Sequence, residues 1–434
     1  MFPAIAAIAA AMQRADNMTA EREHRAALPL GFVEFITLIA MLMALNALSI
    51  DPMLPALPAI GEALGIAEEN SRQWIISAYF LGMAVGSLFY GSLSDRYGRK
   101  PVLVVTLSFY LVSTLACAVA TSFAMMLAGR AAAGFFAAAV RVVAVSIVRD
   151  LFVGDRMARI MSVIFIVFMI VPVIAPTLGQ VILYIASWRW IFGALLVLGA
   201  AMALWTIFRL PETLTDANRI DISLDDVAAT FGQIITHRSA FGYMLASGVS
   251  MGALVGFITS VQQIFFDVFH EPEVFPFAFA AIAGFIAIGS FFNSRLVERM
   301  GARRLSQGSL MAFILLSAIH VGIILSGWET VWTFIAMQSS ALLCFALCGS
   351  NFSSISMEPF ARGAGAASSF QACLTTLLSA LIGAFIGSLF DGTTLPLALG
   401  FLLCGTGGLL GVMWAERGKL FTRPNIPKMP APCR

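Results

Sequence analysis

Long runs of apolar residues, separated by short polar stretches, set the pattern of this 434-residue chain. Runs of about 20 apolar residues have the length that an α-helix needs to cross a bilayer. Strands of a membrane barrel would instead alternate apolar and polar residues over about 10 positions. The pattern therefore predicts an all-α membrane protein with twelve spanning helices in two bundles of six. We place the first six near 31–55, 73–93, 101–120, 123–147, 158–183 and 189–209, and the second six near 241–266, 275–297, 305–326, 329–354, 364–389 and 393–415.

The polar stretches divide the chain into five parts. We predict an N-terminal lead (1–30), a first bundle (31–209), a linker (210–240), a second bundle (241–415) and a tail (416–434). The linker is rich in aspartate and has room for a short surface helix. The apolar stretch before Met18 is too short to span a bilayer and lacks the basic start of a signal peptide. It fits either a surface helix or a start site placed upstream of Met18.

Composition supports a chain that lies mostly in lipid. Hydrophobic residues make up 59% and charged residues 12%, whereas soluble domains carry about 25% charged residues. The net charge of +2 gives no sign of a nucleic-acid partner. Of the six cysteines, five lie in apolar segments and one in the tail, so we expect no disulfide framework. Cys344 and Cys348 are one helical turn apart but have no nearby histidine or acid, so we predict no metal and no cofactor.

Basic residues set the predicted orientation. Of the 26 lysines and arginines, Arg72 and Arg189 fall outside when both termini are cytoplasmic, and Arg130 and Arg141 fall within the fourth segment. All the others fall on the cytoplasmic side. Cytoplasmic loops of membrane proteins carry an excess of such residues. We therefore predict that both termini are cytoplasmic.

A charged turn between the second and third segments recurs in the second half. The stretch Gly91-Ser-Leu-Ser-Asp95-Arg96-Tyr-Gly98-Arg99-Lys100 has a degraded copy that runs from Ser294 to Arg303. A tight turn at matching places in two halves indicates an internal duplication. An ordinary charged loop at the aqueous face would explain the charge but not the repeat.

Three charged residues fall where lipid is expected: Asp51 in the first segment, and Arg130 and Arg141 in the fourth. Each costs roughly 2.5–3.5 kcal/mol at the centre of a spanning helix on insertion scales, so a water-filled pathway or a buried partner is expected. The two arginines are 11 residues apart, which places them on one stripe of a helix. Asp51 precedes Pro52, and a proline disfavours the helical state just before it. Asp51 therefore marks an expected break in the first helix.

These charges suggest a coupling mechanism. We hypothesise that Asp51 and Arg130 lie close enough to influence each other, and that Asp51 takes up a proton on one side and releases it on the other. A cationic or polar substrate that competes for the same carboxylate would then be exchanged for protons. A static ion pair that holds two helices together is the alternative.

Several motifs resemble those of a known family. The repeated turn is similar to the signature loop of the major facilitator superfamily. The stretch Ser49-Ile50-Asp51-Pro52-Met53-Leu54-Pro55-Ala56-Leu57-Pro58 resembles the first-helix motif of its bicyclomycin-resistance (Bcr/CflA) group of drug:proton antiporters. Arg130 with Gly134 is similar to the fourth-helix motif of these antiporters, although Ala133 stands where glutamine is common. In the fifth segment, Pro172, Pro176 and Gly179 match the antiporter motif, while Gln180 replaces its usual final glycine.

The resemblance implies roles for particular residues. The turn would act as a gate made of Gly91, Asp95, Arg96, Gly98 and Arg99. Asp95 would face the start of the eleventh helix near 366–368, and Arg99 would pair with Asp150. The alternative is that these charges only keep the helices from sliding into lipid. The prolines and glycine of the fifth segment would allow bending and close packing, as in any proline-kinked spanning helix.

Other polar residues within the segments are candidates for substrate contact: Asn46, Arg141, Gln262, Gln263 and Asn351. Each could equally make an interhelical hydrogen bond. No Walker loop, no HExxH motif and no cluster of the four histidines points to an enzyme.

The leading interpretation is a secondary transporter in the bacterial inner membrane that exports small amphipathic drugs or antibiotics in exchange for protons by alternating access. The resemblance implies a monomer whose partners are the small-molecule substrate, protons and the lipid bilayer. A proton-coupled transporter of a native metabolite is the alternative, and a receptor that kept the transporter fold is a third possibility.

Overall fold

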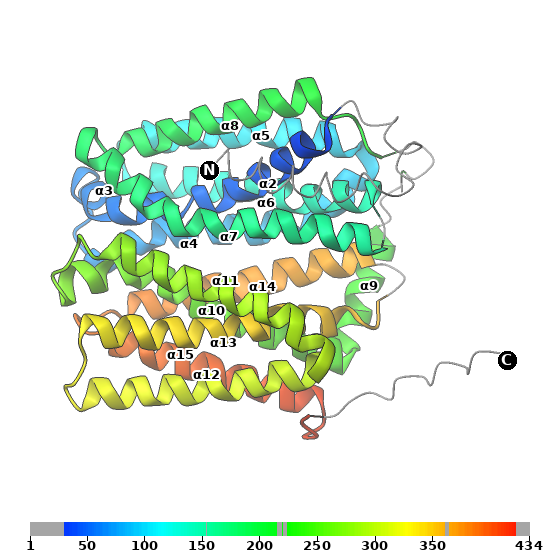
Figure 1. Cartoon of the computed structure of the whole chain (residues 1–434). Helices are drawn as coiled ribbons and strands as arrows, with labels where there is room; N and C mark the ends of the chain where they lie inside the picture. Colours follow the sequence, from blue (N-terminus) through cyan, green and yellow to red (C-terminus); the bar gives the residue numbers. More distant parts are fainter. Residues whose placement is uncertain (1–29, 153, 215–218, 220–223, 361–363, 422–434) are drawn as a thin grey trace.

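The structure is a computed structural model that describes residues 30–152, 154–214, 219, 224–360 and 364–421. Within these ranges the chain forms helices and no strand (Figure 1). The first half comprises α2 (Phe32–Leu48), η2 (Asp51–Ala56), α3 (Leu57–Ala63), η3 (Glu69–Gln73), α4 (Trp74–Tyr97), α5 (Arg99–Ala118), α6 (Phe123–Leu151), α7 (Gly154–Ile185) and α8 (Arg189–Arg209). The second half comprises α10 (Arg238–Gln263), η5 (Ile264–Val268), α11 (Phe275–Met300), α12 (Ala302–Leu325), α13 (Val331–Met357), α14 (Ala364–Ser388) and α15 (Leu395–Ala415), and α9 (Leu224–Thr236) lies between the halves.

The predicted all-helical membrane fold is confirmed. Eleven helices in the described residues are long and apolar enough to cross a membrane. The remaining predicted segment, 158–183, falls on α7. Among the residues of α7 whose side chains are described, the continuous apolar stretch is Ile170–Ile185, which is shorter than a full span. The predicted lead and tail lie mostly outside the described residues. The linker does contain a short helix, α9.

Exposed apolar side chains mark the faces that lipid would cover. Large hydrophobic residues stand exposed along α5, α8, α12 and α15, for example Val112, Val197, Leu315 and Leu403, each more than 60% exposed. By contrast, α2 is buried without interruption from Phe35 to Asn46. A helix bundle in lipid has inner helices that pack against protein and outer helices whose apolar side chains face the lipid. The helix that leads into Asp51 therefore lies in the interior.

Helix packing repeats between the halves. In the first half α4 and α5 both pack on α6, α5 packs on α8, and α2 packs on α7. In the second half α11 and α12 both pack on α13, α12 packs on α15, and α10 packs on α14. The halves meet through two reciprocal pairs, α4 with α14 and α7 with α11, and Figure 1 shows α7 beside α11 at the centre of the molecule. The packing thus follows the duplication that the repeated turn predicts.

The two copies of the turn also share a backbone conformation. Gly98 joins α4 to α5 at φ 99° and ψ 156°, and Gly301 joins α11 to α12 at φ 82° and ψ 148°. Only glycine adopts this region without strain.

We call this end of the bundle the Arg99 end, and the opposite end, where η3 leads into α4, the Gln73 end.

Candidate functional site

The first spanning helix breaks at Asp51, as its prolines predict. Helix α2 ends at Leu48, and a 3₁₀ turn, η2, begins at Asp51. Pro52 has no N–H, and the Met53 N–H bonds to the Ile50 carbonyl at 3.2 Å. The Ser49 carbonyl therefore has no donor from the following turn of its own helix. In an apolar interior such a group needs a partner from elsewhere.

Arg130 supplies that partner. Its Nη1 donates to the Ser49 carbonyl at 2.9 Å and its Nε donates to the Ile75 carbonyl at 3.1 Å. The guanidinium carbon lies 4.5 Å from the centroid of the Tyr79 ring, a cation–π distance. Gly134, one turn further along α6, lets α6 approach α4, because a Cβ there would overlap the Tyr79 carbonyl oxygen. Arg130 thus ties α6 to both α2 and α4.

The Asp51 carboxyl has no such attachment. It is 5% exposed, and no hydrogen bond or ion pair joins it to another described side chain, Arg130 included. Arg130 Nε and Nη1 donate to main-chain carbonyls and its buried Nη2 has no partner among the described residues, so its connection to Asp51 runs through the backbone, two residues away at Ser49. A static ion pair between the two residues, the alternative considered above, is absent from the described part of the chain.

Neutral side chains complete a polar cluster around Arg130. The Tyr79 hydroxyl donates to Asn46 Oδ1 at 3.1 Å, and Asn46 Nδ2 lies 3.5 Å from the Ala137 carbonyl. Ser49 Oγ and the Tyr110 hydroxyl are 2.7 Å apart. Sequence reasoning did not single out either tyrosine as part of a site. The available signal was a hydroxyl in the middle of an apolar run, which needs a partner when buried.

Arg141 differs from Arg130 although both lie on one stripe of α6. Arg130 is 2% exposed, whereas Arg141 is exposed. No hydrogen bond or ion pair to Arg141 is present among the described residues. Since a stripe that buries Arg130 against α2 and α4 faces the interior, the exposure of Arg141 indicates access to solvent from inside the bundle and not contact with lipid.

The structure separates the other predicted substrate residues. Gln262 is 2% exposed without a hydrogen-bonded partner in the described part of the chain. Asn351 on α13 donates to Asn293 Oδ1 on α11 at 2.6 Å and to the Leu347 carbonyl at 2.8 Å. Asn46 belongs to the Arg130 cluster, and Gln263 lies at the Gln73 end. The interhelical hydrogen bond considered for these residues is thus found for Asn46, Gln263 and Asn351.

Gln263 takes part in a chain of amides that joins the two halves, which we call the amide latch (Asn70, Gln73 and Gln263). Gln73 Nε2 donates to Gln263 Oε1, and Gln263 Nε2 donates to Asn70 Oδ1 at 3.2 Å. Asn70 Nδ2 donates to the carbonyls of Ser388, the last residue of α14, and of Phe390 just after it, at 3.2 and 2.9 Å. Sequence reasoning missed Asn70 and Gln73 because they lie in a short polar connection with no recognisable motif.

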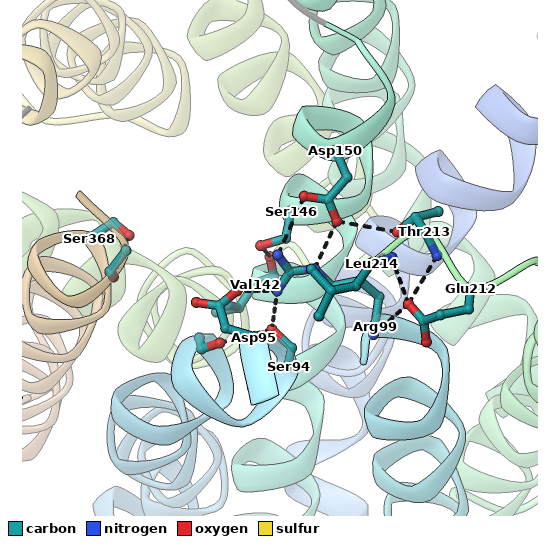
Figure 2. A network of polar contacts seen from close by, with 12 residues as sticks. Ser94, Asp95, Arg99, Val142, Ser146, Asp150, Glu212, Thr213, Leu214 and Ser368 are labelled. Atoms are coloured by element: carbon teal, nitrogen blue, oxygen red, sulfur yellow. Dashed lines mark hydrogen bonds and ion pairs between the residues drawn. The ribbon is translucent and has the colours of Figure 1, made fainter. Parts of the chain in front are cut away.

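A second network occupies the Arg99 end, and Figure 2 shows it. Arg99 Nε donates to Asp150 Oδ2 at 2.9 Å, and Arg99 Nη1 donates to Asp95 and, at 2.7 Å, to Ser94 Oγ. The Arg99 and Lys100 backbone amides donate to the Glu212 carboxylate at 2.9 and 3.1 Å. The Arg99–Asp150 pair expected from the resemblance is therefore present. Glu212, after α8, is a member that the motif did not indicate.

Gly91 and Asp95 lie where α4 meets α14. A Cβ at Gly91 would be too close to Ser369 Oγ, and the Cβ position of Gly365 lies 3.7 Å from Asp95 Oδ2. Asp95 therefore lies near the start of α14, as expected, with Ser368 across from it in Figure 2. Arg96 instead lies over the ring of its neighbour Tyr97, at 5.4 Å from the centroid.

The second half has a network of the same design. Arg303 donates to Glu358 at 2.8 Å and to Glu416 at 2.9 Å. Glu358 follows α13 and Glu416 follows α15, which matches Asp150 at the end of α6 and Glu212 after α8. The arginine stands one position later in the turn than Arg99. The second copy of the turn has Ala302 where the first has Arg99. It nevertheless keeps an arginine that pairs with two acids at the ends of neighbouring helices.

Helix α7 contains both Pro172 and Pro176. Gly179 packs against η2, because a Cβ there would overlap the Pro52 carbonyl oxygen. The next residue, Gln180, has a buried Oε1 without a partner among the described residues. Close packing against the break in the first helix, and not bending alone, is therefore what Gly179 provides.

The described residues offer no site for a metal ion, since they contain no group of three or more histidine, cysteine or acidic side chains suited to one. Cys117, Cys344, Cys348, Cys373 and Cys404 are free thiols. Cys433 lies outside the described residues.

Known proteins share this sequence and fold. The family model of the Major Facilitator Superfamily matches residues 37–384. A bicyclomycin resistance protein homolog of Haemophilus influenzae is 28% identical over 333 residues, which cover 75% of this chain and 82% of that protein. The multidrug resistance protein MdtL of Escherichia coli K12 is 26% identical over 363 residues, which cover 81% of this chain and 88% of that protein. The resemblance drawn from the motifs is confirmed.

Solved structures agree in fold. The human organic anion transporter MFSD10 superposes with a TM-score of 0.68 at 18% identity, covering 91% of this chain and 100% of that chain. A D-xylose–proton symporter superposes with a TM-score of 0.65 at 12% identity, covering 89% of this chain and 98% of that chain.

Proposed function

The chain belongs to the major facilitator superfamily, and from that premise we propose that it exports small amphipathic drugs in exchange for protons. Membership makes the protein a multi-pass membrane transporter and not an enzyme. Two relatives are named for resistance to bicyclomycin and to multiple drugs, which supports the choice of substrate.

The observation that carries the proton coupling is the buried Asp51 at the break in the first helix, which has no hydrogen-bonded or ionic partner among the described residues. An ionised carboxylate without a partner is costly in a low-dielectric interior. The group therefore needs either a proton or a cationic group of the substrate, and these two exclude each other. Exchange of one for the other at a single carboxyl is antiport.

Arg130 supports the exchange at Asp51 by fixing the position of that residue. By holding the Ser49 carbonyl it stabilises the break two residues before Asp51, so the carboxyl is presented at a defined depth. A shift of α6 relative to α2 would change the surroundings of Asp51 without any direct contact between the two side chains.

Alternating access would use the contacts between the halves. Between described residues, hydrogen bonds across the halves occur at the Gln73 end, through the amide latch. At the Arg99 end the described ion pairs stay within one half. We propose that the bundles 31–209 and 241–415 rock about the central packing, that the turns at Gly98 and Gly301 gate the Arg99 end, and that this end faces the cytoplasm, as the basic residues predict.

The test is drug-driven proton movement in liposomes that contain the purified protein. Asp51→Asn keeps the shape of the side chain but carries no exchangeable charge, so we expect drug addition to move no protons while the protein stays folded. Asp391→Asn removes an exposed acid from a connecting loop and is the matched control, which should retain coupling. Full coupled exchange by the Asp51 variant would refute the proposal.

A further inference from the structure

The interior of the bundle contains an imbalance of charge. Within the spanning helices, the described charged side chains away from the helix ends are Asp51, Arg130 and Arg141. Glu34, near the start of α2, already pairs with Arg209 at 2.8 Å. Two guanidinium groups thus accompany one carboxyl, which leaves at least one positive charge without a counter-ion.

The two arginines do not share this deficit equally. Arg130 is 2% exposed and makes two hydrogen bonds to carbonyls and a contact with the Tyr79 ring. Arg141 has no hydrogen bond or ion pair within the described residues and is reached by solvent. A cation kept in the membrane interior without a protein partner is costly, and here the open partner position is accessible to a ligand.

We propose that the transported compounds are amphoteric, with an acidic group that binds Arg141 and a basic group that competes with the proton at Asp51. This inference rests on the proposed function and specifies its substrate class. The planar guanidinium binds carboxylates through two parallel hydrogen bonds. An acid alone would favour protonation of Asp51 and so would not exchange for a proton, whereas a compound with both charges satisfies both unpartnered groups.

The spacing along α6 limits the shape of such a compound. Arg130 contacts Ser49, two residues from Asp51, and Arg141 lies 11 residues, or about 16 Å of helix, beyond Arg130. The acidic and basic groups of the substrate should therefore stand at opposite ends of an elongated molecule, with the apolar part between them.

Binding to the purified full-length protein in detergent tests the inference with two probes: norfloxacin, which is amphoteric, and its methyl ester, which keeps only the basic group. We expect norfloxacin to bind at least about tenfold more tightly than its ester, the worth of one charge-assisted hydrogen bond. Arg141→Gln should reduce norfloxacin to the affinity of the ester and leave the ester unchanged. Arg141→Lys should keep part of the difference in affinity between norfloxacin and its ester.

Equal binding of norfloxacin and its ester by the wild-type protein would overturn the inference. So would an Arg141→Gln variant that still prefers norfloxacin over the ester. Because these measurements need no proton gradient, they are separate from the test of Asp51. A preserved preference for the amphoteric probe, together with absent proton exchange, would refute the proposed antiport and leave the role of Arg141 standing.

Discussion

At the scale of single residues, two arginines on one helix stripe have different tasks. Arg130 is a structural donor whose removal leaves the Ser49 and Ile75 carbonyls without their side-chain partner. We expect Arg130→Met to lower the free energy of unfolding by about 1–2 kcal/mol for each interhelical bond lost. Lysine offers a donor but no fork, so Arg130→Lys should recover about half of this loss. Thermal unfolding in detergent measures both.

Arg141→Met is the control on the same stripe. Because Arg141 has no hydrogen-bonded or ionic partner in the described part of the chain, its replacement should leave the unfolding temperature unchanged or raise it. Equal destabilisation by the two substitutions would contradict the difference in their roles.

At the scale of elements, the packing of α7 against η2 depends on Gly179. Any side chain there meets the carbonyl oxygen of Pro52, and backbone cannot move aside as the end of a flexible side chain can. We expect Gly179→Val to destabilise the protein by about 1–3 kcal/mol, the usual cost of overpacking, and to slow transport because η2 carries Asp51. The unfolding temperature and drug-driven proton flux report the two effects.

Leu178, the preceding residue on α7, is 47% exposed and provides the comparison. Leu178→Val introduces a β-branched residue at a neighbouring position without touching η2, so it should change neither quantity. If Leu178→Val proved as harmful as Gly179→Val, a general intolerance of α7 to β-branched residues would replace the packing explanation.

At the scale of the whole molecule, the amide latch should open in every transport cycle. We expect a short reversible thiol cross-linker between cysteines at Gln73 and Gln263, in a background without the native cysteines, to abolish transport. A reductant should restore it. The reason is that the two positions belong to different halves, whose rocking must separate them.

A cross-link within one half gives the matched control. Asn293 and Asn351 also contact each other, at 2.6 Å, but both lie in the second half, so cysteines cross-linked there should leave transport intact. Undiminished transport by the cross-linked Gln73–Gln263 pair would rule out an obligatory opening of the Gln73 end.

Particular residues show how far sequence reasoning reached. It located the break at Asp51 from Pro52, and the Arg99–Asp150 pair from the resemblance, because both depend on local chemistry or on a preserved motif. It placed Arg130 near Asp51 but did not identify the Ser49 carbonyl as its hydrogen-bond acceptor, since that free carbonyl becomes visible only once the backbone hydrogen bonds are known. It also could not link Gln263 to Asn70 and Gln73, which are distant in the chain.

What the chain determines by itself is where it crosses the membrane and which charges enter it, because transfer from water to lipid acts on each segment almost independently. The expected spanning segments and the three interior charges follow from that, and the duplicated turn is read directly from the repeated motif. Which groups these charges contact was decided only by tertiary packing. Polar side chains inside a bundle bind whatever donor or acceptor the neighbouring helices present, and that depends on the arrangement of helices in space.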